Sequence, residues 1–139
     1  HWQLALSVNN LGDERYLDAS LRVARRFLSL LDNEIVPLWD FRLPDDPALH
    51  IRDSSAAAIA ACGFQELEML GHADESIRAA KDAFIDRLCS PDYLDTDLSV
   101  RGAVKHGQTG NPVKAYTSWG DYYLMEALAR ENGTEVTWW

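Results

Sequence analysis

Three polar side chains could act at the start of a helix in the middle of this chain. Asp53, Ser54 and Ser55 stand directly before residues 56–62, seven residues without a polar side chain. Asp or Ser at such a point accepts hydrogen bonds from the free N–H groups of the first helical turn, so an N-cap is the favoured interpretation. A second interpretation stays open, in which Asp53 orients a group of a functional site at this helix end.

Aromatic side chains offer a second kind of chemistry, because an indole ring presents a flat apolar face on which a sugar ring can stack. Trp39 begins the sequence Trp39-Asp40-Phe41, and it either stacks on a sugar or fills the space between a loop and a helix. Trp119 and Tyr122 lie in a segment that is apolar nearly all round. For these two residues, packing is favoured over contact with a substrate.

Two further polar residues need an explanation. His106 lies between two irregular stretches, where a histidine is either exposed to solvent or part of a ligand site. Asp121 interrupts the apolar segment around Trp119, and a buried acid requires a partner. We predict a structural role for Asp121, with Lys114 or a helix N-terminus as its partner.

The elements that position these residues are helices. We predict no substantial sheet and five helices, near residues 2–11, 14–31, 54–70, 74–89 and 118–132. Asp13, Asp53 and Asp74 are the expected N-caps of the second, third and fourth helices. The second helix has one apolar face, whereas the third and the last are apolar on most sides and must be surrounded by protein. The third and last helices are therefore predicted to be the buried, inner ones.

Glycines that can end a helix recur at Gly12, Gly71 and Gly133, which lie 59 and 62 residues apart. Each unit has an outer amphipathic helix, a long loop, an inner apolar helix and a tight turn. A fixed period of this size is typical of arrays of one supersecondary unit. Because each inner helix needs neighbours on both flanks, we predict that the chain is part of a larger helical array.

The long loops both lead to the N-terminus of an inner helix, and loops longer than about 12–15 residues are usually functional or disordered. Several inner-helix N-termini would then point toward one face, each with partial positive charge and unpaired N–H groups. We predict that this face binds an anionic ligand.

Composition excludes several classes of function. The net charge of −9 disfavours nucleic acid as a partner, because such binding requires a basic face. No run of 18 apolar residues is present, so no membrane-spanning helix and no membrane partner are expected. A cytoplasmic location is favoured, since no secretory signal is visible. Cys62 and Cys89 lack metal-like spacing and are expected to be free thiols, and neither a metal nor a cofactor is expected.

Several segments carry a resemblance to a known family. The segments VPLWDFRLPDD (residues 36–46) and RDSSAAAIAACGFQEL (residues 52–67) resemble the unsaturated glucuronyl hydrolases, family 88 of the glycoside hydrolases. The segment SWGDYYLMEALAR (residues 118–130) is similar to the one that closes the last inner helix of these enzymes. A weaker match is to the unsaturated rhamnogalacturonyl hydrolases, which share the fold.

The resemblance implies an all-α fold, an (α/α)6 barrel of six helical hairpins, of which residues 1–139 would be the C-terminal part. Six units of about 60 residues require roughly 360 residues, in agreement with the repeat. It also implies a reaction, the hydration of the C4–C5 double bond of an unsaturated uronic acid left by polysaccharide lyases, with an aspartic acid as the acid–base group. In the family the catalytic aspartates lie in a region absent from this sequence, so no residue here is expected to be catalytic.

The resemblance further assigns a role in substrate binding. In the family, the loop before the last inner helix contacts the sugar beyond the cleaved bond. The implied partner is a small oligosaccharide with an unsaturated uronic acid. The candidate substrate-binding residues are four from the corresponding loop and two tryptophans: His106, Gln108, Thr109, Lys114, Trp39 and Trp119.

Two other functions stay open. One keeps the barrel but changes the sugar, toward rhamnogalacturonan products or an epimerase. The other is a helical-repeat scaffold that binds protein partners. Scaffold repeats generally have short and similar loops, so two long and dissimilar loops favour a binding pocket.

Overall fold

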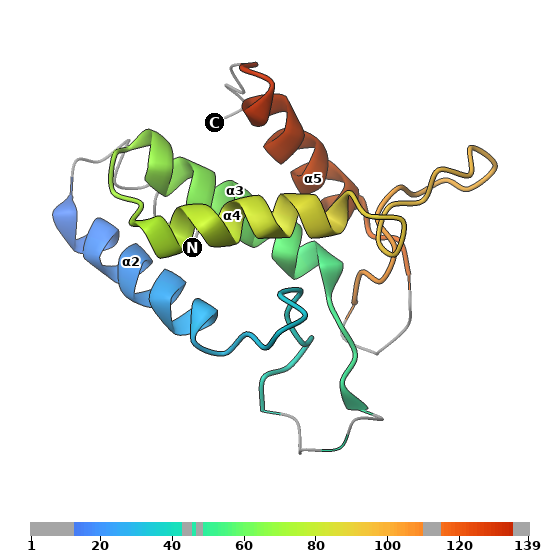
Figure 1. The fold of residues 1–139 in the computed structure, drawn as a ribbon, viewed down its shortest axis with the longest axis horizontal. Helices are drawn as coiled ribbons and strands as arrows, with labels where there is room; N and C mark the ends of the chain where they lie inside the picture. Colours follow the sequence, from blue (N-terminus) through green and yellow to red (C-terminus); the bar gives the residue numbers. More distant parts are fainter. Residues whose placement is uncertain (1–12, 43–45, 47–48, 110–114, 135–139) are drawn as a thin grey trace.

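The computed structural model describes residues 13–42, 46, 49–109 and 115–134 (Figure 1). This part contains four helices: α2, Glu14–Leu28; α3, Ser54–Met69; α4, Glu75–Leu88; and α5, Ser118–Glu131. It forms no strand, only three isolated antiparallel bridges. The prediction of an all-α fold is confirmed, and the predicted helix of residues 2–11 lies outside the described residues.

Short polar side chains begin the helices, as the sequence predicts. Asp13, Asp53 and Asp74 accept hydrogen bonds from the backbone N–H groups of their own first turns, at 3.0 to 3.1 Å. At α5 the cap is Thr117, whose hydroxyl oxygen accepts from the N–H of Gly120 at 3.1 Å. These bonds satisfy donors that a helix leaves unpaired at its N-terminus.

The end of α2 differs from the prediction of a helix over residues 14–31. The helix ends at Leu28, where the N–H groups of Leu30 and Leu31 bond to carbonyls three residues back instead of four. The hydroxyl of Ser29 donates to the carbonyl of Arg26 at 2.8 Å. The apolar periodicity continues beyond this tightened turn because Leu31 still packs against the core.

Two glycine turns close the inner helices in the same way. Gly71 and Gly133 have φ angles of +76° and +75°, a left-handed conformation that favours glycine. In each turn the glycine N–H bonds three residues back, and the next residue's N–H bonds five residues back, at 2.8 to 2.9 Å. The equal geometry supports the predicted repeat, while Gly12 lies outside the described residues.

The helix α3 is the centre of the fold. It packs against both α4 and α5, and α4 also contacts α2; Figure 1 shows α4 crossing in front of α3. Most of α3 is buried, whereas α2 buries only Ser20 and Ala24. The prediction that α3 is an inner helix is confirmed. The helix α5 is less buried than α3, since its Met125 is 68% exposed, so its burial exceeds that of α2 by less than we predicted.

Charged side chains join the inner helices. The guanidinium of Arg130 lies 2.7 Å from a carboxylate oxygen of Glu126 and 3.3 Å from one of Glu66, and all three side chains are at most 8% exposed. On α4, Lys81 pairs at 2.9 to 3.1 Å with three carboxylates, among them Glu68 of α3 and Glu131 of α5. Burial opposes the charge of Lys81, but its hydrogen bonds with these carboxylates raise its pKa.

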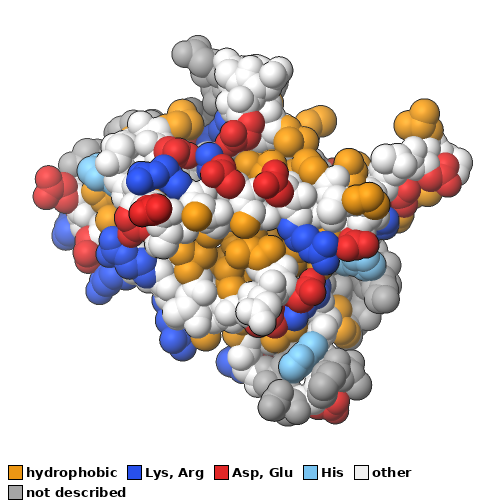
Figure 2. All heavy atoms as spheres, in the orientation of Figure 1, with side chains coloured by type: hydrophobic (Ala, Val, Ile, Leu, Met, Phe, Trp, Pro, Cys, Tyr) orange, Lys and Arg blue, Asp and Glu red, His pale blue; other side chains and the backbone are white. Residues whose placement is uncertain are grey.

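In the described ranges no helix has the length and apolar character needed to cross a membrane. Cys62 and Cys89 are both free thiols, as predicted, and burial raises the pKa of Cys62 to about 12. The loop of residues 94–104 projects from the helices (Figures 1 and 2), and its Leu98 is 99% exposed.

Candidate functional site

The two long loops meet at the N-terminus of α3. The carboxylate of Asp53 accepts a hydrogen bond from the N–H of Ser55 at 3.0 Å and another from the N–H of Gln108 at 3.3 Å. The carbonyl of His106 accepts from the N–H of Ser54 at 3.2 Å. Asp53 is therefore an N-cap that also binds the loop before α5, and the two loops are held together.

This junction changes the prediction of an anion site at the inner-helix N-termini. The N–H groups of Ser54 and Ser55 both have acceptors within the chain, the carbonyl of His106 and the carboxylate of Asp53. The negative charge of that carboxylate also opposes a bound anion. The first turn of α3 therefore lacks the open anion site that we predicted.

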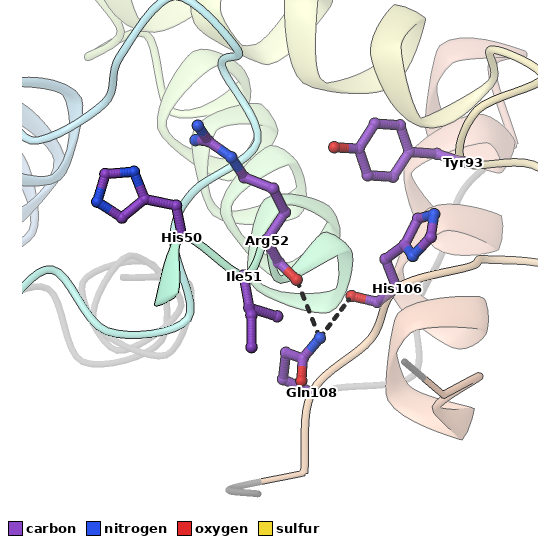
Figure 3. Close-up of a pocket in the computed structure, with 6 residues that line it drawn as sticks. All are labelled: His50, Ile51, Arg52, Tyr93, His106 and Gln108. Carbon is purple, nitrogen blue, oxygen red and sulfur yellow. Dashed lines mark hydrogen bonds between the residues drawn. The ribbon is translucent and has the colours of Figure 1, made fainter. Parts of the chain in front are cut away.

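A cavity of about 250 Å³ lies beside the junction (Figure 3). Its lining comes from three segments, which lie before α3, after α4 and before α5. The Gln108 side chain bridges two of these segments, because its amide nitrogen donates to the carbonyl of Arg52 at 3.1 Å. The six lining residues are His50, Ile51, Arg52, Tyr93, His106 and Gln108.

His106 has an unusual backbone conformation. Its φ of +69° lies in the left-handed region, which costs a residue other than glycine about 1–3 kcal/mol. Neighbouring bonds hold it there: its carbonyl is bonded to α3, and Gly107 pairs with Ala115. Such strain persists only where the surroundings enforce it, and it is concentrated at functional sites.

Tyr93 forms one wall of the cavity. Its ring meets the His106 ring edge-on, with centroids 5.5 Å apart, and the guanidinium carbon of Arg87 lies 5.0 Å from its centroid. The residue is only 5% exposed. Burial raises the pKa of Tyr93, so its hydroxyl group remains protonated at neutral pH.

The charge of Arg52 is balanced outside the cavity. Its guanidinium donates to both carboxylate oxygens of Asp32, at 2.8 and 2.6 Å, and to the carbonyl of Val36 at 2.9 Å. These bonds lower the pKa of Asp32, which stays ionised. The cavity thus presents an amide, a phenol and two imidazoles, which suit a polar ligand rich in hydroxyl groups. Among the described residues, no three His, Cys, Asp or Glu side chains gather as metal ligands do.

The six predicted substrate-binding residues do not all converge. His106 and Gln108 line the cavity, and the exposed Thr109 follows them in the loop. Trp39 is half-buried before α3, Trp119 is 41% exposed on α5, and neither lines the cavity. Lys114 lies outside the described residues.

Sequence reasoning missed His50, Arg52 and Tyr93. None lies in a periodic pattern, because each lies in an irregular segment next to a helix end, although Arg52 begins the segment of residues 52–67 that resembles the family. The one available signal was their position, since Arg52 directly precedes the cap of α3 and Tyr93 follows α4 closely.

Asp121 has a structural role and lies in the first turn of α5, at a helix N-terminus as predicted, while Lys114 lies outside the described residues. Its carboxylate accepts hydrogen bonds from the N–H groups of Ala103 and Val104, at 3.1 and 2.7 Å. Asp121 therefore fastens the base of the projecting loop to α5.

Curated relatives of this chain are enzymes. The unsaturated glucuronyl hydrolase of Bacillus sp. (strain GL1) is 38% identical over 97% of this chain and 38% of its own length. An unsaturated chondroitin disaccharide hydrolase of Streptococcus pneumoniae (strain ATCC BAA-255 / R6) is 33% identical over 91% of this chain and 34% of its own length. The chain thus spans about a third of the length of the curated relatives it matches. A comparison with models of protein families finds no match.

The solved structures that resemble this chain are enzymes of the same kind as these relatives. The unsaturated glucuronyl hydrolase of Bacillus sp. GL1 matches with a TM-score of 0.80 and 34% identity, over 94% of this chain and 36% of that one. A mutant of the Streptococcus agalactiae enzyme, complexed with dGlcA-GalNAc6S, has a TM-score of 0.85 and 28% identity over 99% of this chain and 38% of that one. In sequence and in fold, this chain belongs to the unsaturated glucuronyl hydrolases, glycoside hydrolase family 88, and its helices are part of an (α/α)6 barrel.

Proposed function

We propose that the complete protein is a glycoside hydrolase that acts on unsaturated uronyl oligosaccharides released by polysaccharide lyases. The observation that carries this proposal is the 38% identity to the Bacillus enzyme over 97% of the chain, a match that takes in both long loops. The names of the relatives indicate substrates with unsaturated glucuronyl groups, one of them a chondroitin disaccharide.

In the proposed reaction, water adds across the C4–C5 double bond of the unsaturated uronic acid. A carboxylic acid donates a proton to one carbon, the water oxygen bonds to the other, and the water gives up a proton to the carboxylate, which restores the acid. The resulting hemiketal rearranges and releases the neighbouring sugar. We place the aspartates that do this chemistry in the part of the complete protein that precedes residues 1–139, a C-terminal portion of one barrel domain.

The described residues would contribute to the wall around the leaving sugar. His106 and Gln108 line the cavity, and their loop is fixed to the N-terminus of α3, so a sugar there would meet groups that are already oriented. Thr109, Lys114, Trp39 and Trp119 remain proposed contacts. The streptococcal complex with dGlcA-GalNAc6S supports a small oligosaccharide as the partner.

The test uses the complete enzyme and disaccharides prepared with polysaccharide lyases. Hydration removes the double bond, so we expect the ultraviolet absorbance of the substrate to fall with time. A saturated disaccharide serves as the control, since it has no such double bond. No loss of absorbance with glucuronyl and chondroitin disaccharides, from a folded protein with intact upstream aspartates, would overturn the proposal and favour a binding scaffold.

A further inference from the structure

Two polar atoms in the cavity lining, the hydroxyl group of Tyr93 and the amide oxygen of Gln108, have no hydrogen-bond partner among the described residues. The hydroxyl group of Tyr93 forms no hydrogen bond with any of the described residues, although the residue is only 5% exposed. Figure 3 shows this hydroxyl pointing into the space between Tyr93 and Arg52. By contrast, the hydroxyl of Tyr116 is already bonded to the carboxylate of Asp95.

The environment of Tyr93 fixes the direction of that hydroxyl. The ring lies against His106 and Arg87, and the Tyr93 carbonyl accepts a hydrogen bond from the N–H of Lys105 at 2.8 Å. Arg87 is itself bonded to Glu34 and Asp92, at 3.1 and 2.8 Å. A buried tyrosine usually finds a partner for its hydroxyl group. Here the open side of the hydroxyl faces the cavity, so a ligand that enters the cavity meets a hydrogen-bonding group that the protein does not use.

The size and chemistry of the cavity restrict that ligand. A volume of about 250 Å³ is slightly below the roughly 300–1,000 Å³ of pockets for drug-sized molecules, so it suits a single sugar ring. The charge of Arg52 is compensated by Asp32. The amide group of Gln108 and the hydroxyl group of Tyr93 carry no formal charge and both donate and accept hydrogen bonds, as hydroxyl groups of a sugar require.

We propose that Tyr93 is a substrate-binding residue whose hydroxyl group hydrogen-bonds to a hydroxyl group of the leaving sugar in this cavity. The inference rests on the proposed function. Since the bond selects for one sugar hydroxyl group in one position, Tyr93 contributes to the choice of leaving sugar. Its ring has a second role, to hold the side chain of His106 in place.

The test is the substitution Tyr93→Phe in the complete enzyme, which removes the hydroxyl group and leaves the ring contacts. A neutral hydrogen bond is worth about 0.5–1.5 kcal/mol, so we expect KM to rise about two- to twelve-fold. We expect kcat to change less than two-fold and Tm to stay the same, because no bond within the protein is lost. Tyr93→Leu also removes the ring, so it should lower Tm and raise KM further.

Modified substrates distinguish a direct hydrogen bond between Tyr93 and the sugar from an indirect effect of the substitution on the protein structure. Disaccharides that each lack one hydroxyl group on the leaving sugar should include one that the native enzyme and Tyr93→Phe bind equally well. Tyr16→Phe, on the exposed side of α2, is the matched control and should leave KM unchanged. A native KM for Tyr93→Phe, or a lowered Tm without a change in KM, would overturn the proposal.

A direct binding measurement separates this proposal from the proposed function. If the native enzyme hydrates no unsaturated disaccharide, the proposed function fails. Calorimetry with free N-acetylgalactosamine and glucose then still tests the cavity. Weaker binding to Tyr93→Phe than to the native protein would support the contact, and equal binding or none would overturn it.

Discussion

Asp53 connects the stability of α3 to the position of the second loop. Its carboxylate accepts hydrogen bonds from the N–H and hydroxyl groups of Ser55 and from the N–H of Gln108. The local cap was predictable because Asp precedes an apolar run. The bond to Gln108 was not, since it joins residues 55 positions apart through two irregular loops.

We predict that Asp53→Ala in the complete enzyme lowers the free energy of unfolding by about 1–2 kcal/mol, the usual cost of losing an N-cap. It should also raise KM, because the loop that carries His106 loses one of its anchors. Urea denaturation and steady-state kinetics measure the two effects. Asp86→Ala, at an exposed position of α4, is the control and should change stability by less than about 0.5 kcal/mol. A native stability for Asp53→Ala would contradict the role of the cap.

Arg130 lies between two buried carboxylates, those of Glu66 and Glu126. Replacing Arg130 with Met would leave both acids buried without their cation. Because a buried pair is then broken, we expect the free energy of unfolding to fall by about 3–5 kcal/mol. Arg22→Met removes a pair with Asp18 in which both side chains are about 70% exposed, so it should cost less than about 1 kcal/mol. Denaturant unfolding of both variants tests this. An equal decrease in the free energy of unfolding for the two variants would show that the burial of the ion pair does not determine its contribution to stability.

The helices were the predictable elements, and the cavity was not. Apolar periodicity and capping residues predicted α2 to α5, because both signals depend on neighbours within a few residues. The error at the end of α2 arose because Leu30 and Leu31 continue the apolar pattern after the backbone has left the helix. The cavity depends on Tyr93 meeting His106 and on Gln108 meeting Arg52, contacts between loops that leave no pattern in the sequence.

The cap of α4 predicts a dependence of stability on pH. Hydrogen bonds from the hydroxyl of Ser76, and then from the N–H of Ile77, lower the pKa of Asp74 to about 2. Its pKa in an unfolded chain is about 3.9. Because the folded-state pKa is the lower one, the stabilisation is fully present above about pH 5 and is lost as the pH falls toward 2.

We therefore expect Asp74→Ala to be less stable than the native enzyme at pH 7, by about 0.5–2 kcal/mol. The difference should shrink between pH 5 and pH 2 as the native carboxylate becomes protonated. Urea unfolding at several pH values measures it, with Asp86→Ala as a control whose carboxylate is also on α4 but does not cap it. A difference that stays constant down to pH 2 would contradict the role of the ionised carboxylate.

At the scale of the whole molecule, α5 has a neighbour on one side only among the described elements. It packs against α3 and, less extensively, α4. Large apolar side chains remain open to solvent on it: Met125 is 68% exposed, Trp119 41% and Leu128 40%. An apolar groove of about 400 Å³ runs along the same helix. Since the chain spans 36% of the Bacillus structure, we expect a further hairpin of the barrel to cover this surface in the complete enzyme.

The last prediction is that residues 1–139 alone are inactive and fold poorly. Burying a large apolar side chain contributes about 1.5–3 kcal/mol, and a domain is stable by only about 5–15 kcal/mol. Several such side chains left in water on α5 would use up much of that margin, so we expect a molten or oligomeric state. The proposed catalytic aspartates are also absent from this part. Expression of residues 1–139 tests both claims by denaturant unfolding, size-exclusion chromatography and the absorbance assay. A cooperative transition of a monomer would overturn the first claim, and turnover above background would overturn the second.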